Sequence, residues 1–326
     1  MDFFAQQAAS RRQSRLFVAA FVVTVVVVVL ALDAVIFTVL AAREPAGPGY
    51  GPQPLGPLSY ALAYPDTALG VSVLIVAAIA LSSAFKSQQL RAGGAVVARS
   101  LGGVRVEPDT QDPSRQRLRN IVEEMSIASG VPMPEIYVLE QEPGINAFAA
   151  GHSPADAAIT VTHGALEHLD RDELQGVIGH EFSHILNGDM RLNVQLMGLV
   201  FGLLVIAVLG RLVFYFAPRG GDRRGNSGMA WVAIGLAIMI LGYIGLLAGR
   251  ILQAAVSRQR ERLADASAVQ FTRTPSGLKA ALMKIAVLEE GSHLVAADAE
   301  QVAHMLFAPG LDRIFATHPP LLERIR

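Results

Sequence analysis

The chain of 326 residues has a net charge of −1, with 52% hydrophobic and only 17% charged residues. Soluble domains carry about 25% charged residues, so this composition argues against an ordinary soluble globular protein. The high hydrophobicity excludes a disordered chain, and the near-neutral charge predicts no nucleic-acid partner. The absence of cysteine excludes disulfides and thiolate zinc ligands.

Four stretches are apolar over the roughly 20 residues that a bilayer-spanning helix needs. A cleaved signal peptide is the alternative for the first stretch, and a buried soluble hairpin is the alternative for the last two. The length of the apolar runs favours membrane helices over both. Glycine pairs in the last two stretches, Gly198/Gly202 and Gly245/Gly249, suit close contacts between such helices. The four stretches are 16–42, 67–85, 192–210 and 229–249.

The positions of the basic residues predict the orientation. They cluster before the first stretch and after the second, whereas the loop 43–66 holds one basic residue, six prolines and four glycines. The positive-inside rule therefore places the N-terminus in the cytoplasm and the loop outside, where we expect an extended, polyproline-like chain. Arg219, Arg223 and Arg224, which lie between the last two stretches, oppose the rule. Either that hairpin does not cross fully, or the first pair of helices dominates the topology.

These observations divide the chain into four sections. A membrane hairpin (1–90) with a Pro/Gly-rich external loop is followed by a polar section of mixed structure (91–191). A second membrane hairpin (192–250) precedes a second, mostly helical polar section (251–326). Both polar sections lie on one side of the membrane if each hairpin spans twice, so they can build one site facing the cytoplasm. We expect a multi-pass integral membrane protein.

Local patterns predict the elements of the first polar section. A helix over 114–129 stops at Gly130, and 135–140 and 158–162 are typical of short strands. Asp170 is a favourable helix cap, and Gly188 is a suitable stop after Asn187. The expected fold class is therefore α+β: a mostly helical membrane protein with four transmembrane helices, and a polar domain with a small antiparallel sheet.

The helix that begins after Asp170 carries His180-Glu181-Phe182-Ser183-His184. Residues four apart share one helical face, so both imidazoles can converge on one zinc ion. Glu181 then lies near enough to take a proton from a metal-bound water. The alternative is an exposed helix that carries two surface histidines.

A catalytic zinc site needs a third protein ligand and one open position. Met190 stands where a third histidine would follow His184, so a glutamate from a later helix is the other solution. Glu261 and Asp265 lie four apart after the last apolar stretch. Glu261 can bind zinc while Asp265 accepts a hydrogen bond from a ligand histidine. The alternative is a solvated charge cluster, because three arginines surround Glu261.

Together these motifs resemble the HtpX-type integral membrane zinc metalloproteases, gluzincin-like relatives of the CAAX prenyl endopeptidases. The resemblance extends from Val104 to the C-terminus and includes 146–151, 187–189, 257–268 and 317–320. It implies a zincin-like metalloprotease domain in a bacterial-type inner membrane. It also implies one Zn²⁺ per chain, held by His180, His184 and Glu261, with Glu181 as the catalytic base. Such relatives continue beyond the position of Arg326, which suggests a chain that is truncated at its C-terminus.

The resemblance also singles out two further segments. Residues Asn146, Ala147, Phe148 and Ala149 read as an exposed strand edge that holds an extended substrate through main-chain hydrogen bonds. An ordinary edge strand or turn is the alternative. His318 is assigned as a catalytic donor to the oxyanion, with a structural role before Pro319 as its alternative.

The function expected from these observations is that of a membrane-embedded zinc endopeptidase. Its partners would be polypeptides, in particular membrane or misfolded proteins, and the lipid bilayer, and its oligomeric state stays open. The resemblance implies a role in proteolytic quality control or a stress response. The alternatives are a non-catalytic zinc-stabilised scaffold or chaperone and, within the protease class, a prenyl-peptide endopeptidase.

Overall fold

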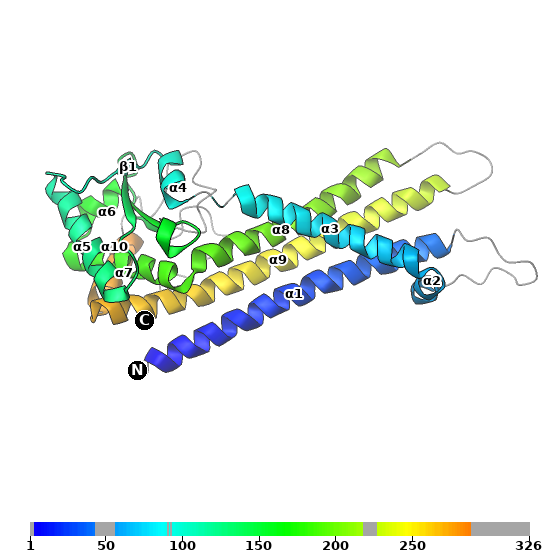
Figure 1. Cartoon of the computed structure of the whole chain (residues 1–326), viewed down its shortest axis with the longest axis horizontal. Coiled ribbons are helices and arrows are strands. Elements are labelled where there is room, and N and C mark those ends of the chain that lie inside the picture. Colours follow the sequence, from blue (N-terminus) through cyan, green and yellow to red (C-terminus); the bar gives the residue numbers. More distant parts are fainter. Residues whose placement is uncertain (1–2, 43–55, 90, 92, 218–226, 288–326) are drawn as a thin grey trace, which may run out of the picture. The chain divides into compact units, whose positions relative to one another are not determined.

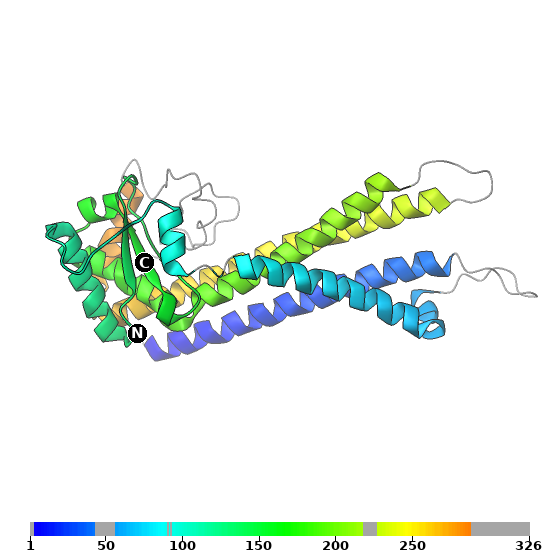
Figure 2. The same cartoon turned by 45° about the horizontal axis from the view of Figure 1, so that its top comes forward.

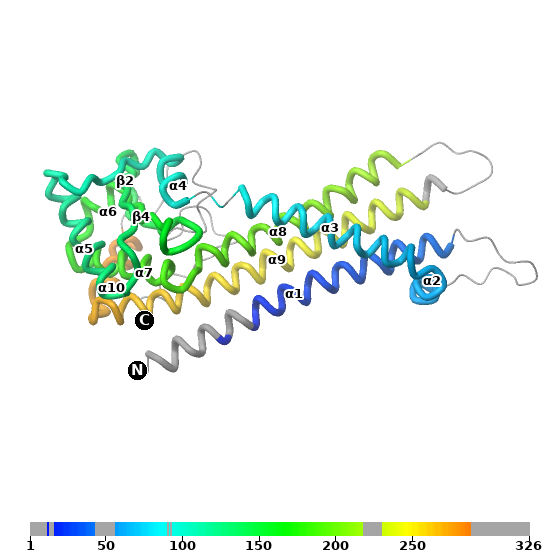
Figure 3. Tube along the Cα trace, viewed as in Figure 1, coloured from blue at the N-terminus to red at the C-terminus, as the bar shows by residue number. Residues whose placement is uncertain are grey.

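The computed structural model describes residues 3–42, 56–89, 91, 93–217 and 227–287, which form two compact units. The helical unit contains Val18–Ser87 and Leu196–Leu252. The mixed unit contains Met1–Phe17, Gln88–Gln195 and the chain after Leu252. Among the helices that contribute residues to both units are α8 (Asp189–Phe216) and α9 (Ser227–Thr272). Figures 1 and 3 show each of them as one continuous helix.

Four helices of the described chain are long and apolar enough to cross a membrane, as the sequence predicts. They are α1 (Phe3–Ala41) and α3 (Pro65–Gln89), together with α8 and α9. Their apolar segments have mean hydropathies between 2.3 and 2.9. The fourth helix is much longer than the predicted span, because α9 continues without a break to Thr272 and carries Glu261 and Asp265.

Glycines of α8 lie directly against the backbone of α3 in the helical unit. A Cβ atom at Gly202 would lie 2.8 Å from the carbonyl oxygen of Ile79, and one at Gly198 would lie 2.8 Å from that of Ser83. The spacing of these glycines therefore serves close helix packing, as the sequence predicts. Gly245 and Gly249 are less tightly enclosed, because their nearest neighbours are side-chain atoms at 3.0 Å or more.

The substitution Gly202→Val should destabilise the helical unit. Overpacking of a tight contact costs about 1–3 kcal/mol, so the midpoint of thermal unfolding in detergent should fall. Gly70→Ala on α3 is the control, since a Cβ atom there would meet nothing within 4 Å. Equal midpoints for the two variants would contradict the close contact between α8 and α3.

The described end of the loop after the first membrane helix is helical. The prediction of an extended loop is wrong for Pro57–Ala63, which forms the helix α2. Proline occupies the first turn of this helix, where a backbone N–H has no partner within the helix in any case. Tyr60 of α2 is buried and packs near Phe37 and Ala41 of α1, which anchors this short helix. Residues 43–55 lie outside the described part of the chain.

Four short strands form a mixed sheet in the mixed unit. They are β1 (Val104–Arg105), β2 (Glu135–Leu139), β3 (Ala147–Ala150) and β4 (Ala158–Thr162), in the order β1-β2-β4-β3. The outer pairs are antiparallel, but β2 and β4 are parallel. The prediction of an antiparallel sheet is therefore wrong. After β2, the chain first forms β3 at the edge of the sheet and then forms β4 between β2 and β3.

Helices cover both faces of this sheet (Figure 2). On one face, α4 (Gly94–Ser100) packs Val97 against Leu139 and Phe148. The main core lies on the other face, between the sheet and four helices. These helices are α5 (Pro113–Ser129), α6 (His163–His168), α7 (Arg171–Asn187) and α10 (Ser276–Val287).

The caps of α7 agree with the sequence analysis. Asp170 and Glu173 form a capping box, in which each side chain accepts a hydrogen bond from the other residue's backbone N–H. Gly188 ends the helix with a φ of 68°, a left-handed conformation that glycine adopts without strain. The ends of α7 are therefore fixed locally, and its interior is buried on most sides.

Candidate metal centre

Three potential metal ligands meet inside the mixed unit. The two histidines of α7, His180 and His184, face Glu261 of α9, and one ligand atom of each lies within 4.8 Å of the others. The Nε2 atoms of the two imidazoles are 3.1 Å apart. The carboxylate oxygens of Glu261 lie 3.4 Å from Nε2 of His180 and 3.5 Å from Nε2 of His184.

These distances fit a single small metal ion. Ligand atoms at 2.0–2.2 Å from a tetrahedral zinc ion lie about 3.3 Å from one another. Imidazole and carboxylate are also the ligand types that zinc takes in sites without cysteine. His180, His184 and Glu261 could therefore hold one zinc ion with no large rearrangement.

The far sides of both imidazoles are held by carboxylates. Nδ1 of His180 lies 2.9 Å from Oδ1 of Asp265, and Nδ1 of His184 lies 2.8 Å from Oδ2 of Asp189. When Nδ1–H donates to a carboxylate, Nε2 keeps its lone pair for a metal. Asp265 thus lies against His180, and Asp189, to which the sequence analysis assigned no role, lies against His184.

Glu181 points into a small cavity beside these ligands. Its side chain is buried, and Oε2 accepts a hydrogen bond from the backbone N–H of Ala149 at 2.8 Å. Oε1 is also buried and has no hydrogen-bond partner among the described residues. The cavity has a volume of about 20 Å³, which is space for one water molecule. This arrangement suits a carboxylate that receives a proton from a water molecule.

The electrostatic environment favours positive charge at the centre. Burial alone would lower the pKa of His180, but hydrogen bonds with Asp265 and Glu261 raise it above its ordinary value. Burial opposes the charged form of His184 as well, yet Asp189 and Glu261 raise its pKa to about 9. Burial raises the pKa of Glu181. The carboxylates around the imidazoles would stabilise a bound cation in the same way.

Only part of the predicted substrate-binding strand lines the cavity. Ala149 does so, with its N–H directed at Glu181. Asn146 is buried and caps the adjacent strand, since its Oδ1 accepts from the N–H of Ala147 at 3.0 Å. The side chain of Phe148 packs on the opposite face of the sheet with Leu139. His318 lies outside the described residues.

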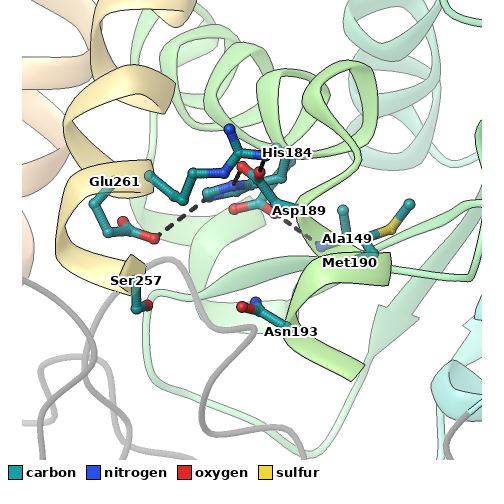
Figure 4. Close-up of a pocket in the computed structure, with 9 residues that line it drawn as sticks. Ala149, His184, Asp189, Met190, Asn193, Ser257 and Glu261 are labelled. Carbon is teal, nitrogen blue, oxygen red and sulfur yellow. Dashed lines mark hydrogen bonds and ion pairs between the residues drawn. The ribbon is translucent and has the colours of Figure 1, made fainter. Parts of the chain in front are cut away.

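Four further residues line the cavity, as Figure 4 shows for the labelled ones. Ser257 lies one turn before Glu261 on α9, and Asn193 lies one turn after Asp189 on α8. The helical spacing of four residues could have indicated Ser257, because Glu261 was already a candidate ligand. No such signal pointed to Asn193, because Asp189 had no assigned role. The four residues are Met190, Asn193, Ser257 and Arg260.

The site combines two histidines and a glutamate with a second, buried glutamate beside them. It lies in an α+β unit, and the described part of the chain also has four helices that are long and apolar enough to cross a membrane. Together these features define a membrane metallopeptidase. The comparison of the chain with protein families agrees. The family described as Peptidase family M48 matches residues 113–326. The chain belongs to peptidase family M48, whose metalloproteases are in general zinc-dependent.

Known relatives of the chain carry the name Protease HtpX homolog. The protein of Streptococcus uberis is 38% identical over 212 residues, which are 63% of this chain and 70% of that protein. The protein of Dictyoglomus turgidum is 38% identical over 224 residues, with 66% and 70% covered. That of Caldanaerobacter subterraneus is 40% identical over 234 residues, with 70% and 74% covered. The predicted HtpX-type membrane zinc metallopeptidase is confirmed.

One solved structure is also similar to the chain. The crystal structure of S. mikatae Ste24p matches with a TM-score of 0.47 and 17% sequence identity. The match covers 81% of this chain and 57% of that one.

Proposed function

We propose that the chain binds one zinc ion through His180, His184 and Glu261 and cleaves polypeptides with Glu181 as the general base. The observation that carries this proposal is the position of the Glu181 carboxylate. Its Oε1 is buried and has no hydrogen-bond partner among the described residues, and Glu181 lines a cavity together with His184 and Glu261. Zinc, when bound there, would polarise the substrate carbonyl and make a water molecule more acidic.

The protein groups then have separate tasks. Glu181 takes the proton of the attacking water and delivers it to the nitrogen of the departing amine. The N–H of Ala149 fixes Oε2 and leaves Oε1 available for this transfer. Asp265 and Asp189 orient the two imidazoles.

The proposed substrate path follows β3. This strand pairs with β4 on one side, while Ala149 reaches Glu181 on the other. A substrate main chain that extends beside Ala149 would bring its scissile carbonyl next to the cavity. His318 is retained as a proposed donor to the oxyanion, on the basis of the resemblance of 317–320 to the family motif.

Membrane or misfolded proteins are the substrates that fit the chain best, in a quality-control or stress function. The support comes from connectivity, because Asp189 and Glu261 lie on helices that also carry membrane-competent segments. A closed structural zinc site would take four protein ligands. The described residues supply a group of three, and the buried carboxylate of Glu181 beside this group supports catalysis rather than a zinc-stabilised scaffold.

The functional test compares two substrates in proteoliposomes. The zinc-loaded protein should cleave casein, and it should cleave casein fused to a single membrane helix faster because tethering raises the local concentration. A chelator should stop both reactions, and added zinc should restore them. Hydrolysis confined to a prenylated peptide would favour the prenyl-peptide alternative. A zinc-loaded protein that cleaves none of these would favour the scaffold.

The proposed cytoplasmic position of the site is testable by thiol labelling, since the natural chain contains no cysteine. In intact cells, a membrane-impermeant maleimide should leave Gln111→Cys unlabelled and should label Pro52→Cys. Gln111 is exposed in the mixed unit, and Pro52 lies in the loop between the first two membrane helices. After the cells are opened, both positions should react. Labelling of Gln111→Cys in intact cells would reverse the orientation.

A further inference from the structure

Arg260 contacts the turn that joins α7 to α8. Its Nη2 donates a hydrogen bond to the carbonyl oxygen of Asn187 at 2.9 Å, and it forms an ion pair with Oδ1 of Asp189. Gly188, between these two residues, has a φ of 68°. One guanidinium from α9 therefore holds the residues on both sides of the turn.

Asp189 connects Arg260 to His184, a proposed zinc ligand. Its carboxylate is buried, with one oxygen at Arg260 and the other 2.8 Å from Nδ1 of His184. A buried carboxylate is costly unless a cation or strong hydrogen bonds compensate it. The two carboxylates that contact the Nδ1 atoms differ in burial, since the side chain of Asp189 is 4% exposed and that of Asp265 is 20% exposed.

Consecutive residues of α9 thus act on opposite sides of one imidazole. Glu261 lies 3.5 Å from Nε2 of His184, while Arg260 acts on Nδ1 through Asp189. Both contacts join the C-terminal end of α7 to α9 at the metal centre. A shift of Arg260 would move the orienting carboxylate and change the direction of the imidazole.

We propose that Arg260 is a positioning residue of the metal centre, which orients His184 through Asp189. This inference rests on the proposed binding of zinc by His180, His184 and Glu261. It assigns to Arg260 the task of fixing the Nδ1–H donor and the direction of the imidazole. Neither Arg260 nor Asp189 would touch the metal.

The test is a double-mutant cycle on zinc affinity, measured by competition with a chromophoric chelator. Arg260→Met and Asp189→Asn should each weaken zinc binding about 10–100-fold, the usual effect of removing an outer partner of a metal ligand. Because both residues act through one contact, Arg260→Met should add less than about threefold to the effect of Asp189→Asn. Arg260→Lys, which keeps the charge, should recover part of the affinity.

Arg258→Met is the control, because Arg258 is exposed on the same helix. Its zinc affinity should equal that of the wild type. The inference is overturned if Arg260→Met binds zinc like the wild type. It is also overturned if the double variant loses zinc affinity by the product of the two single-variant factors. If Arg260→Met does not fold without metal, Arg260→Lys and Asp189→Asn decide by the same criteria. A wild-type protein that binds no zinc refutes the proposed function instead.

Discussion

Glu181→Gln should abolish peptide hydrolysis and leave zinc bound. Glutamine has nearly the same shape and can still accept the N–H of Ala149 through its amide oxygen, but it cannot take a proton from water. General-base catalysis contributes about 10²–10⁴-fold to enzymatic rates, so cleavage of casein should fall by at least two orders of magnitude. The measurement is the initial cleavage rate, together with the zinc content of the same preparation.

Glu167→Gln is the matched control, since the side chain of Glu167 is 62% exposed and lies on α6. It removes one carboxylate without touching the cavity and should retain full activity. A Glu181→Gln variant that cleaves at the wild-type rate would remove Glu181 from the mechanism. A variant that loses zinc as well would assign Glu181 a role in binding the metal.

Glu261→Ala should remove most of the zinc affinity. The carboxylate faces both imidazoles, and its loss leaves two protein ligands where a catalytic site needs three. Loss of a residue that only contacts a metal ligand weakens metal binding by up to roughly 100-fold. We expect Glu261→Ala to weaken zinc binding by more than this, because it removes a ligand itself. Chelator competition measures the affinity, and the cleavage rate should fall with zinc occupancy.

Asp265→Asn is the comparison for this prediction. Asp265 lies on the same helix and contacts Nδ1 of His180 at 2.9 Å, on the side away from the shared centre. Its replacement should weaken zinc binding by about 10–100-fold, which is less than the effect of Glu261→Ala. The reverse order of the two effects would mean that Asp265, and not Glu261, binds the metal.

The sequence predicts much of this architecture because its strongest signals are local. Apolar runs of about 20 residues predict the four long helices, since length and hydropathy are read directly from the chain. The caps at Asp170 and Gly188 predict the limits of α7 for the same reason. The spacing of His180 and His184 on one face predicts that their imidazoles converge, and the structure places their Nε2 atoms 3.1 Å apart.

The features that the sequence does not predict depend on tertiary contacts. The parallel pairing of β2 and β4 requires β3 to lie outside both, and no local pattern specifies that order. The contact between Arg260 and Asp189 joins residues that are 71 positions apart. In the sequence, Arg260 is one of several arginines around Glu261, so its charge alone could not distinguish it from a solvated residue.

The most direct test of the account is a crystal structure of the zinc-loaded protein with an anomalous difference map at the zinc edge. We expect one zinc peak per chain, at about 2.0–2.2 Å from Nε2 of His180, Nε2 of His184 and a carboxylate oxygen of Glu261, with a water molecule in the fourth position. A zinc ion elsewhere in the chain, or a Glu261 carboxylate directed away from both imidazoles, would contradict the account.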